Sequence, residues 1–513
     1  MKSPSMKKLL SALEGEQLIV ASSTEPYSHY YEGSKIKVRT GTGGVVTALD
    51  PLLRASRGTW VSAGLGSADR AVVDEHDRVT VPERAAADDR FTLKRVWMNR
   101  EEEADFLSGV SNSALWPLAH IAYVRPQFVD AQWKTYHQMN RKFAQAVAAE
   151  APEGALVWIN DYQLSLVGSY LRRMRPDLTL AFFWHIPWPA PQVFSICPWA
   201  DELLRALMAH DVVGFNSPYH ASHFMDTVDS LIEARLDRVS STIYYQKRPT
   251  RVEGLPISVD FNRIRSEAAR PPSPRAREMA SAAGGGNRIF AIGVDRMDYT
   301  KGIPEKFKAV DYFLSHNPKY VGRFSLLQIA SPTRVHLDPY QKLQKEVREL
   351  ARQINFKYAA WNWRPQAILN DILHPTDRVP PKKGWQPITL IEDFVPREDI
   401  IHFYSKADLC LVTSLHDGMN LVCKEYVAAR QDGNGALVLS RFAGAARDMR
   451  GARRVNPYSV EETAQAIADS ITQRGAEERR RMDMLEREVS ERDVYVWAAA
   501  FLNRIWRAKS HGR

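Results

Sequence analysis

The stretch Arg288-Ile289-Phe290-Ala291-Ile292, followed by Val294-Asp295-Arg296-Met297-Asp298-Tyr299-Thr300-Lys301-Gly302, indicates the fold of the second half of the chain. The apolar run is typical of a buried strand, and the polar segment after it leads into a helical pattern. Continuous apolar strands separated by helices are typical of a parallel sheet that is covered on both faces. Ligands of such a sheet bind at the carboxyl ends of its strands, and Arg296 and Lys301 follow such an end.

The same strand–helix unit recurs along the chain. Apolar runs predict strands at Leu18–Ala21, Ala155–Ile159, Leu178–Phe183 and Val212–Phe215, and then at Phe324–Ile329, Ile388–Ile391, Leu409–Val412 and Ala436–Leu439. The prolines and glycines of Ser266–Asn287 separate the two series. We therefore expect an α/β fold of two doubly wound, Rossmann-like domains that face a cleft. The expected ranges are a tail at 1–17, an N-terminal domain at 18–275, a second domain at 276–490, and a helix at 491–513 that packs back on the N-terminal domain.

Composition excludes several classes of function. The 513 residues carry a net charge of +9, but the basic residues are scattered, and Arg479-Arg480-Arg481 directly follows two glutamates, which is typical of a solvated helix face. We therefore expect no nucleic-acid partner. An apolar run of the roughly 20 residues needed to span a bilayer is absent, so no membrane partner is expected. The three cysteines lack disulfide or metal-ligand spacing, which predicts a reducing, cytoplasmic location and no metal. Assembly as a homo-oligomer stays open.

Arg296 and Lys301 lie five residues apart across the predicted turn, so both can point into the cleft. An arginine fork together with a lysine charge stabilises the negative charge of a departing nucleotide diphosphate. The alternative from these residues alone is two surface cations at the start of a helix.

The segment Leu415–Tyr426 is the second candidate site. The pattern places Asp417 and Gly418 at a helix N-terminus, where free backbone N–H groups bind anions or sugar oxygens. Glu425, two turns further on, can hold a ribose diol. The alternatives are a simple helix cap for Asp417 and a solvated helix residue for Glu425.

Two polar residues follow predicted strands in the first half of the chain. His185 comes directly after a buried strand and is fixed by the prolines at 187 and 189. Asp161 also follows a strand, where its carboxylate can orient an acceptor hydroxyl. A satisfied core histidine and a helix cap are the respective alternatives.

Taken together, these segments resemble the trehalose-6-phosphate synthases, retaining glycosyltransferases of family 20, a group that includes glucosylglycerol-phosphate synthases. The resemblance runs from about Leu18 to the C-terminus, and the order and spacing of the matching stretches make it specific. These stretches are Gly43-Gly44, Ser111-Asn112, Leu115-Trp116-Pro117, Asp161-Tyr162, His185-Ile186-Pro187, Arg296–Gly302, Gln328-Ile329-Ala330, Asp417–Val422, Lys424-Glu425-Tyr426, Phe442–Ala446 and Val455-Asn456-Pro457.

The resemblance implies a GT-B fold, a UDP- or GDP-glucose donor, front-face attack with retention of configuration, and no resident cofactor or metal. It implies that Arg296 and Lys301 bind the diphosphate, that Glu425 holds the ribose, and that His185 contacts the glucose C6 hydroxyl. The implied residues at the reacting centre are Asp161, His185, Arg296, Lys301 and Asp417. The implied donor-binding residues are Gly43, Gly44, Arg296, Lys301, Asp417, Gly418, Met419, Asn420, Leu421, Val422 and Glu425, and the implied acceptor-binding residues are Trp116, Asp161 and Arg334.

The sequence departs from the family on the acceptor side. Thr24 stands where the synthases have an arginine that grips the acceptor's phosphate, and Leu107 replaces an expected tyrosine, whereas Arg334 is kept. An insertion at 360–383 has no functional interpretation. The leading hypothesis is glucosyl transfer to glucose 6-phosphate, which forms α,α-trehalose 6-phosphate. The open alternatives are another phosphorylated acceptor, glycerol 3-phosphate or a cyclitol phosphate, and a catalytically weak sugar-nucleotide sensor.

Overall fold

The computed structural model describes residues 18–41, 44–83, 85–284, 288–359, 385–473 and 475–511. The chain divides into two compact units, one formed by Met1–Val259 with Arg492–Arg513 and the other by Asp260–Glu491. The second unit begins before residue 276 because helix α11 (Phe261–Ala268) packs against α16 (Arg397–Lys406) and α17 (Val422–Ala429). The expected tail at 1–17 and the insertion at 360–383 lie outside the described residues.

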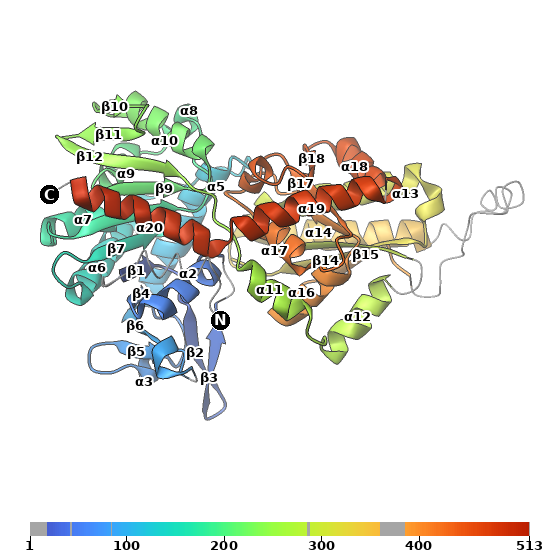
Figure 1. Ribbon diagram of the computed structural model, residues 1–513, viewed down its shortest axis with the longest axis horizontal. Helices are drawn as coiled ribbons and strands as arrows, with labels where there is room; N and C mark the ends of the chain where they lie inside the picture. Colours follow the sequence, from blue (N-terminus) through green and yellow to red (C-terminus); the bar gives the residue numbers. More distant parts are fainter. Residues whose placement is uncertain are drawn as a thin grey trace, which may run out of the picture. The chain divides into compact units, whose positions relative to one another are not determined.

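The first unit is built on one sheet in the order β10-β11-β12-β9-β8-β7-β1-β4-β6-β5 (Figure 1). Neighbours from β12 to β6 are parallel, and antiparallel strands flank this core at both edges. The strands are β1 (Leu18–Ser22), β4 (Thr59–Ala63), β5 (Arg78–Val81), β6 (Phe91–Val96), β7 (Leu156–Asn160), β8 (Thr179–Trp184), β9 (Val212–Phe215), β10 (Arg235–Asp237), β11 (Thr242–Tyr245) and β12 (Arg248–Gly254). A separate hairpin joins β2 (Tyr27–Glu32) and β3 (Lys35–Thr40).

Helices pack around this sheet because its central strands are buried along their whole length. They include α2 (Gly44–Ser56), α5 (Trp116–His120), α6 (Asp130–Glu150), α7 (Val167–Met174), α9 (Ala200–Leu207), α10 (Pro218–Leu231) and α20 (Val494–His511). The C-terminal helix α20 crosses β8 and β9 (Figure 1). Its Trp497 and Phe501 lie against Trp158 with ring centroids 5.3 and 4.8 Å apart, so aromatic burial fixes the helix on the first unit.

The second unit has a fully parallel sheet in the order β15-β14-β13-β16-β17-β18. Its strands are β13 (Ile289–Arg296), β14 (Phe324–Ser331), β15 (Ile388–Ile391), β16 (Leu409–Val412), β17 (Ala436–Ser440) and β18 (Arg453–Val455). Its helices include α11, α12 (Pro274–Gly284), α13 (Ile303–His316), α14 (Asp338–Ala359), α16, α17, α18 (Val460–Thr472) and α19 (Ala476–Glu491). Buried apolar side chains from the sheet and from α13, α14 and α18 form its core.

Both sheets reverse their strand order at one point, between β1 and β7 in the first unit and between β13 and β16 in the second. The second sheet has the strand order of a dinucleotide-binding fold, in which ligands bind outside the carboxyl ends of the strands next to the reversal. The predicted α/β class with two Rossmann-like parallel-sheet domains is therefore confirmed, and it indicates where each unit carries its functional residues.

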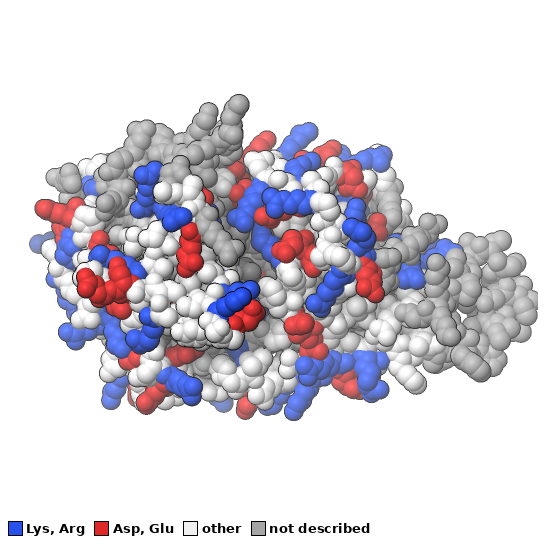
Figure 2. Space-filling model, turned by 90° about the horizontal axis from the view of Figure 1, so that it is seen from below, with Lys and Arg blue, Asp and Glu red and all other residues white. Residues whose placement is uncertain are grey.

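Two further features bear on function. No helix in the described ranges has the length and hydrophobicity needed to cross a bilayer. In the view of Figure 2, basic and acidic side chains are intermixed over the described surface rather than gathered in a basic stripe.

Candidate functional site

In the second unit, the end of β13 and the loop after β16 are locked together. Gly302, between the short helix η4 (Tyr299–Lys301) and α13, has φ +62°, and a Cβ at this position would lie 2.3 Å from the carbonyl oxygen of Thr413. The Leu415 amide donates to the carbonyl oxygen of Thr300 over 2.8 Å. Glycine is therefore required at 302, and the two predicted donor segments become neighbours.

This junction brings Lys301 onto Asp417, 116 residues further along the chain. The Lys301 Nζ lies 2.5 Å from Asp417 Oδ2, and both side chains are largely buried. Ser414 and Asn420 donate to the same carboxylate oxygen over 3.2 Å. The ammonium and the carboxylate thus neutralise each other at the carboxyl end of the sheet.

A second carboxylate lies directly beside them. Asp298 is fully buried and accepts hydrogen bonds from the backbone N–H and the hydroxyl of Thr300. Its Oδ2 lies 3.3 Å from Arg334 Nη1 and 3.4 Å from the Tyr340 hydroxyl. Burial acts to raise the pKa of Asp298, but the charges of Arg334, Arg296 and Lys301 hold it below its ordinary value. Three predicted substrate-binding cations therefore gather around one buried carboxylate.

Arg296, the last residue of β13, is exposed, whereas Lys301 is 8% exposed. Arg334 has φ +49°, and its guanidinium also donates to the Tyr340 hydroxyl over 2.5 Å. The acceptor-side arginine predicted from the sequence is thus held next to the two predicted diphosphate cations.

The segment 417–422 differs from its predicted form. Helix α17 begins at Val422, so Asp417 does not cap a helix and Gly418 does not lie at the helix N-terminus. Asp417 instead forms a bridge with Ala443, and Asn420 adopts φ +69°. Met419 is buried, and its carbonyl oxygen accepts from Ala445, so an extended loop precedes the helix that starts after Leu421. The helix begins later than expected because the chain after Asp417 pairs with the 443–445 segment.

Glu425 lies in the first turn of α17 and is already engaged. Its Oε1 is 3.2 Å from Arg397 Nη1, and its Oε2 accepts from the Tyr404 hydroxyl over 3.4 Å. Its carboxylate is 18% exposed, so a surface position without contacts, the alternative for this residue, is excluded.

In the first unit, Asp161 follows β7 at the reversal of the strand order. Its backbone has φ +71° and ψ 163°, a conformation that non-glycine residues avoid. The carboxylate accepts from the backbone N–H groups of Tyr162 and His185, over 3.0 and 3.1 Å. Strain of this kind persists only where the surroundings impose it, and it is commonest at functional sites.

His185 follows β8, the neighbour of β7. Its Nε2 lies 3.1 Å from Asn160 Oδ1, and its carbonyl oxygen accepts from Asn216. Because the Asn160 amide nitrogen points to the carbonyl oxygens of Ala21 and Trp158, the Nε2 of His185 carries the proton. Burial lowers the pKa of His185 to about 3, so the ring is neutral at physiological pH.

Trp116 begins α5, directly after a π-helical segment at Ala104–Leu115. Its ring is buried and lies 6.1 Å from that of Tyr162, whose hydroxyl donates to Asn112. Extended π-helix is rare and marks functional sites. The structure thus brings Trp116 next to the loop that carries Asp161.

One charged network in the first unit was not predicted. The buried guanidinium of Arg95 contacts Glu25 over 2.5 Å and Asp69 over 2.8 Å. Glu25 directly follows Thr24, which is exposed. Burial, reinforced by Asp69, raises the pKa of Glu25 to about 8 against the opposing charge of Arg95. Arg95 lies inside a strand pattern, so the sequence carries no signal for this contact.

The structure describes only some of the remaining predicted residues. Gly43 lies outside the described residues, and Gly44 is the first residue of α2. Leu107 lies half-buried within the π-helical segment. Among the described residues, no group of three or more His, Cys, Asp or Glu side chains could hold a metal ion.

Comparison with known proteins matches this arrangement to one family. The family model described as Glycosyltransferase family 20 matches residues 16–379 and 381–507. The trehalose-6-phosphate synthase of Mycobacterium avium is 37% identical over 469 residues, which cover 90% of this chain and 89% of that protein.

Solved structures agree with this match. An E. coli structure bound with UDP-2-fluoro glucose is 26% identical, with a TM-score of 0.81 over 96% of this chain and 99% of that chain. A Burkholderia xenovorans α,α-trehalose-phosphate synthase (UDP-forming) in complex with glucose-6-phosphate is 28% identical, with a TM-score of 0.80 over 96% and 100%. The predicted GT-B fold is confirmed, and the chain belongs to glycosyltransferase family 20.

Proposed function

We propose that this glycosyltransferase moves glucose from UDP-glucose to glucose 6-phosphate with retention, releasing UDP and forming α,α-trehalose 6-phosphate. The observation that carries the proposal is the gathering of Arg296, Lys301 and Arg334 around the buried carboxylate of Asp298. Two of these cations suit a departing diphosphate and the third suits the phosphate of an acceptor. Family membership and the substrates of the related synthases support the same assignment.

On the donor side, Arg296 and Lys301 would bind the diphosphate, with help from the backbone at Gly43 and Gly44. Lys301 would exchange Asp417 for a diphosphate oxygen, which frees the Asp417 carboxylate to accept from a glucose hydroxyl. The backbone of 418–422 would contact further glucose hydroxyls, and Glu425 would hold the ribose. These groups stabilise charge that grows as the bond between glucose C1 and the diphosphate breaks.

In the first unit, neutral His185 would contact the C6 hydroxyl of the donor glucose through its ring. Asp161 and Trp116 would position the acceptor, and Arg334 would bind its phosphate. The acceptor hydroxyl would attack C1 from the face that the diphosphate leaves. The new bond then forms without a covalent enzyme intermediate.

A UDP-release assay with UDP-glucose or GDP-glucose against a panel of acceptors tests the proposal. We expect release with UDP-glucose and glucose 6-phosphate, and formation of a non-reducing disaccharide phosphate. Release only with glycerol 3-phosphate or a cyclitol phosphate would show that the acceptor is not glucose 6-phosphate. Thr24 makes this outcome physically reasonable, because it offers no charge where the family has an arginine. Nucleotide binding without release for any acceptor would identify a sensor instead.

Arg334→Ala tests the acceptor assignment within the same assay. Removing one charge-assisted hydrogen bond costs about 1.5–3 kcal/mol, so kcat/KM for glucose 6-phosphate should fall roughly tenfold to a hundredfold. The affinity for UDP should stay near that of the wild type. An unchanged KM for glucose 6-phosphate would show that another group holds the phosphate.

A further inference from the structure

A cationic hollow lies in the second unit, at the amino ends of the strands rather than at the carboxyl ends that carry the predicted donor residues. It has a volume of about 650 Å³. The lining residues come from the end of α11 and the link after it, from α12, from the end of α16, and from the residues at the starts of β13 and β16. Since β13 rises ~3.3 Å per residue, its two ends are roughly 23 Å apart, so this hollow is separate from the site around Arg296.

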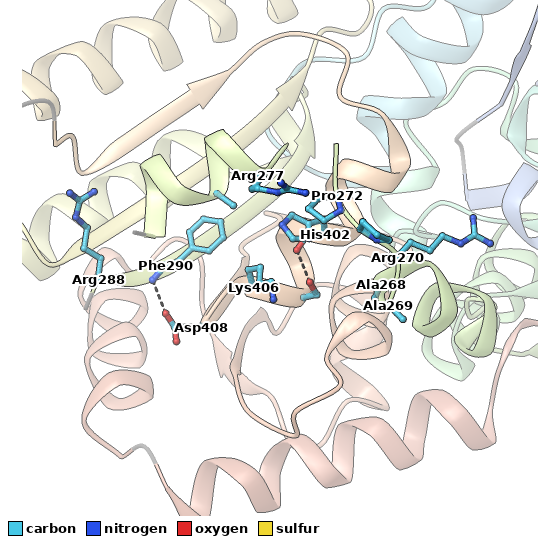
Figure 3. A pocket seen from close by; sticks show the side chains of 13 residues that line it. Ala268, Ala269, Arg270, Pro272, Arg277, Arg288, Phe290, His402, Lys406 and Asp408 are labelled. Atoms are coloured by element: carbon cyan, nitrogen blue, oxygen red, sulfur yellow. Dashed lines mark hydrogen bonds between the residues drawn. The ribbon is translucent and has the colours of Figure 1, made fainter. Parts of the chain in front are cut away.

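Positively charged side chains outnumber negatively charged ones in the lining of this hollow. Four of its lining residues are Arg270, Arg277, Arg288 and Lys406, against the single carboxylate of Asp408. One oxygen of that carboxylate accepts the backbone N–H of Phe290 over 2.8 Å, as drawn in Figure 3. Within the part of the chain that the structure describes, neither Arg277 nor Lys406 has a carboxylate within 4 Å. Arg277 and Lys406 are therefore not neutralised by a carboxylate of the hollow.

His402 provides a buried polar group in the same hollow. Its side chain lines the wall between Arg277 and Lys406 (Figure 3) and is 9% exposed. No hydrogen bond joins its ring to another residue in the described ranges. Burial and then Lys406 lower the pKa of His402, and Arg277 adds to this against Asp399, so both cations act electrostatically on the ring. The neutral ring therefore keeps one N–H donor and one acceptor nitrogen available to a ligand.

Apart from Ser405, the remaining walls are apolar. Phe290, Pro271, Pro272 and three alanines line the hollow beside the charged groups. A volume of this size, apolar walls and a few converging polar groups are typical of small-molecule sites. Arginine, lysine and a histidine N–H are donors that match phosphate oxygens.

We propose that this hollow is a second ligand site, which binds a small phosphorylated molecule through Arg277, Lys406 and His402. The site is distinct from the proposed glucosyl-transfer site, and its existence does not depend on that reaction. The phosphate would lie between the Arg277 guanidinium and the Lys406 ammonium and accept from the His402 ring.

Inorganic pyrophosphate is the probe, titrated calorimetrically into the full-length protein at constant ionic strength with UDP at saturation, so that the donor site is filled. We expect a binding event in the wild type that weakens at least about tenfold in Arg277→Glu/Lys406→Glu, since each charge-assisted contact is worth that much. The matched control, Lys342→Glu/Lys345→Glu, makes the same charge change on exposed positions of α14 and should bind pyrophosphate like the wild type.

Equal UDP affinity in all three proteins shows that the charge reversals leave the fold and the donor site intact. Should the reversal variant unfold, Arg277→Gln/Lys406→Gln replaces it with the same expected loss. Identical pyrophosphate isotherms in the wild type and the pocket variant, an equal loss in the α14 control, or no binding to the wild type would each overturn the proposal.

Discussion

Asp161 and Asp417 hold equivalent places in the two units, yet they are built into the protein in opposite ways. Each follows a strand beside the reversal of strand order, β7 in the first unit and β16 in the second. The carboxylate of Asp417 neutralises the ammonium of Lys301, and side chains of Ser414 and Asn420 support it. The carboxylate of Asp161 accepts from two backbone N–H groups, and its own backbone is strained.

The difference indicates what each half-site must do. Under the proposed function, the second unit would supply cations to a charged leaving group, and carboxylates pair with Lys301 and Arg334 in the absence of substrate because unpaired buried charges are costly. The first unit would direct a neutral hydroxyl, for which geometry imposed by the backbone would matter more than charge. The four predictions below test this contrast, from the largest expected effect to the smallest.

Lys301→Ala should lower kcat for glucosyl transfer roughly 100-fold or more, the usual loss when one group that stabilises transition-state charge is removed. The measurement is steady-state UDP release. Lys308→Ala, which changes an exposed lysine on the following helix α13, serves as the control and should keep normal turnover. Unchanged turnover in Lys301→Ala would contradict the contrast between the two units, because the charge of Lys301 would then not contribute to catalysis.

Gly302→Ala should destabilise the second unit more than Gly433→Ala. Both glycines have similar positive φ, +62° and +64°, but a Cβ at 302 meets the Thr413 carbonyl whereas one at 433 has open space. Each substitution pays the left-handed penalty of about 1–2 kcal/mol, and overpacking adds about 1–3 kcal/mol at 302 alone.

Urea unfolding midpoints of the two variants measure this difference, and UDP binding reports whether the donor loops stay joined. Equal midpoints would show that the Lys301 and Asp417 segments can separate without cost. The close contact between Gly302 and Thr413 would then not be what positions Arg296 and Lys301.

Asp161→Gly and Asp161→Ala separate strain from chemistry in the acceptor half. Both remove the carboxylate, so both should lose most turnover. Glycine adopts φ +71° freely, so the glycine variant should be more stable than the alanine variant by about 1–2 kcal/mol. Thermal unfolding of the pair gives the answer, and an alanine variant as stable as the glycine variant would argue against stored strain.

Protonation of His185 should lower the free energy of unfolding in mild acid. Its pKa is lowered from 6.5 to about 3, so its contribution is full above pH 6.5 and is lost as the pH falls from there towards 3. The expected loss is about 1 kcal/mol per pH unit below 6.5, reduced by partial exposure. His185→Gln should show a shallower decline in Tm between pH 6.5 and 5 than the wild type, whereas His76→Gln at an exposed site should match the wild type. Parallel declines in all three proteins would mean that His185 is not held neutral by the fold.

The amino-acid pattern by itself determined the two α/β series, most buried strands, and the family. The predicted strands at Val212–Phe215, Ile388–Ile391 and Leu409–Val412 match the observed bounds, because continuous apolar runs report burial on both faces directly. The hairpin β2–β3 and the edge strands β10 and β11 were missed. Every residue of β3 is exposed, β10 has no buried residue, and β2 and β11 bury two residues each, so none of them carries a continuous apolar run. The roles of the individual site residues stay predictions.

Only the tertiary structure decided which of those residues meet. The contact of Lys301 with Asp417 spans 116 residues, and that of Arg95 with Glu25 spans 70. The late start of α17 at Val422 depends on pairing between the Asp417 loop and the Ala443 segment. Local periodicity records only whether a residue is buried, whereas these contacts follow from the order of strands in each sheet, which brings distant loops to the same edge.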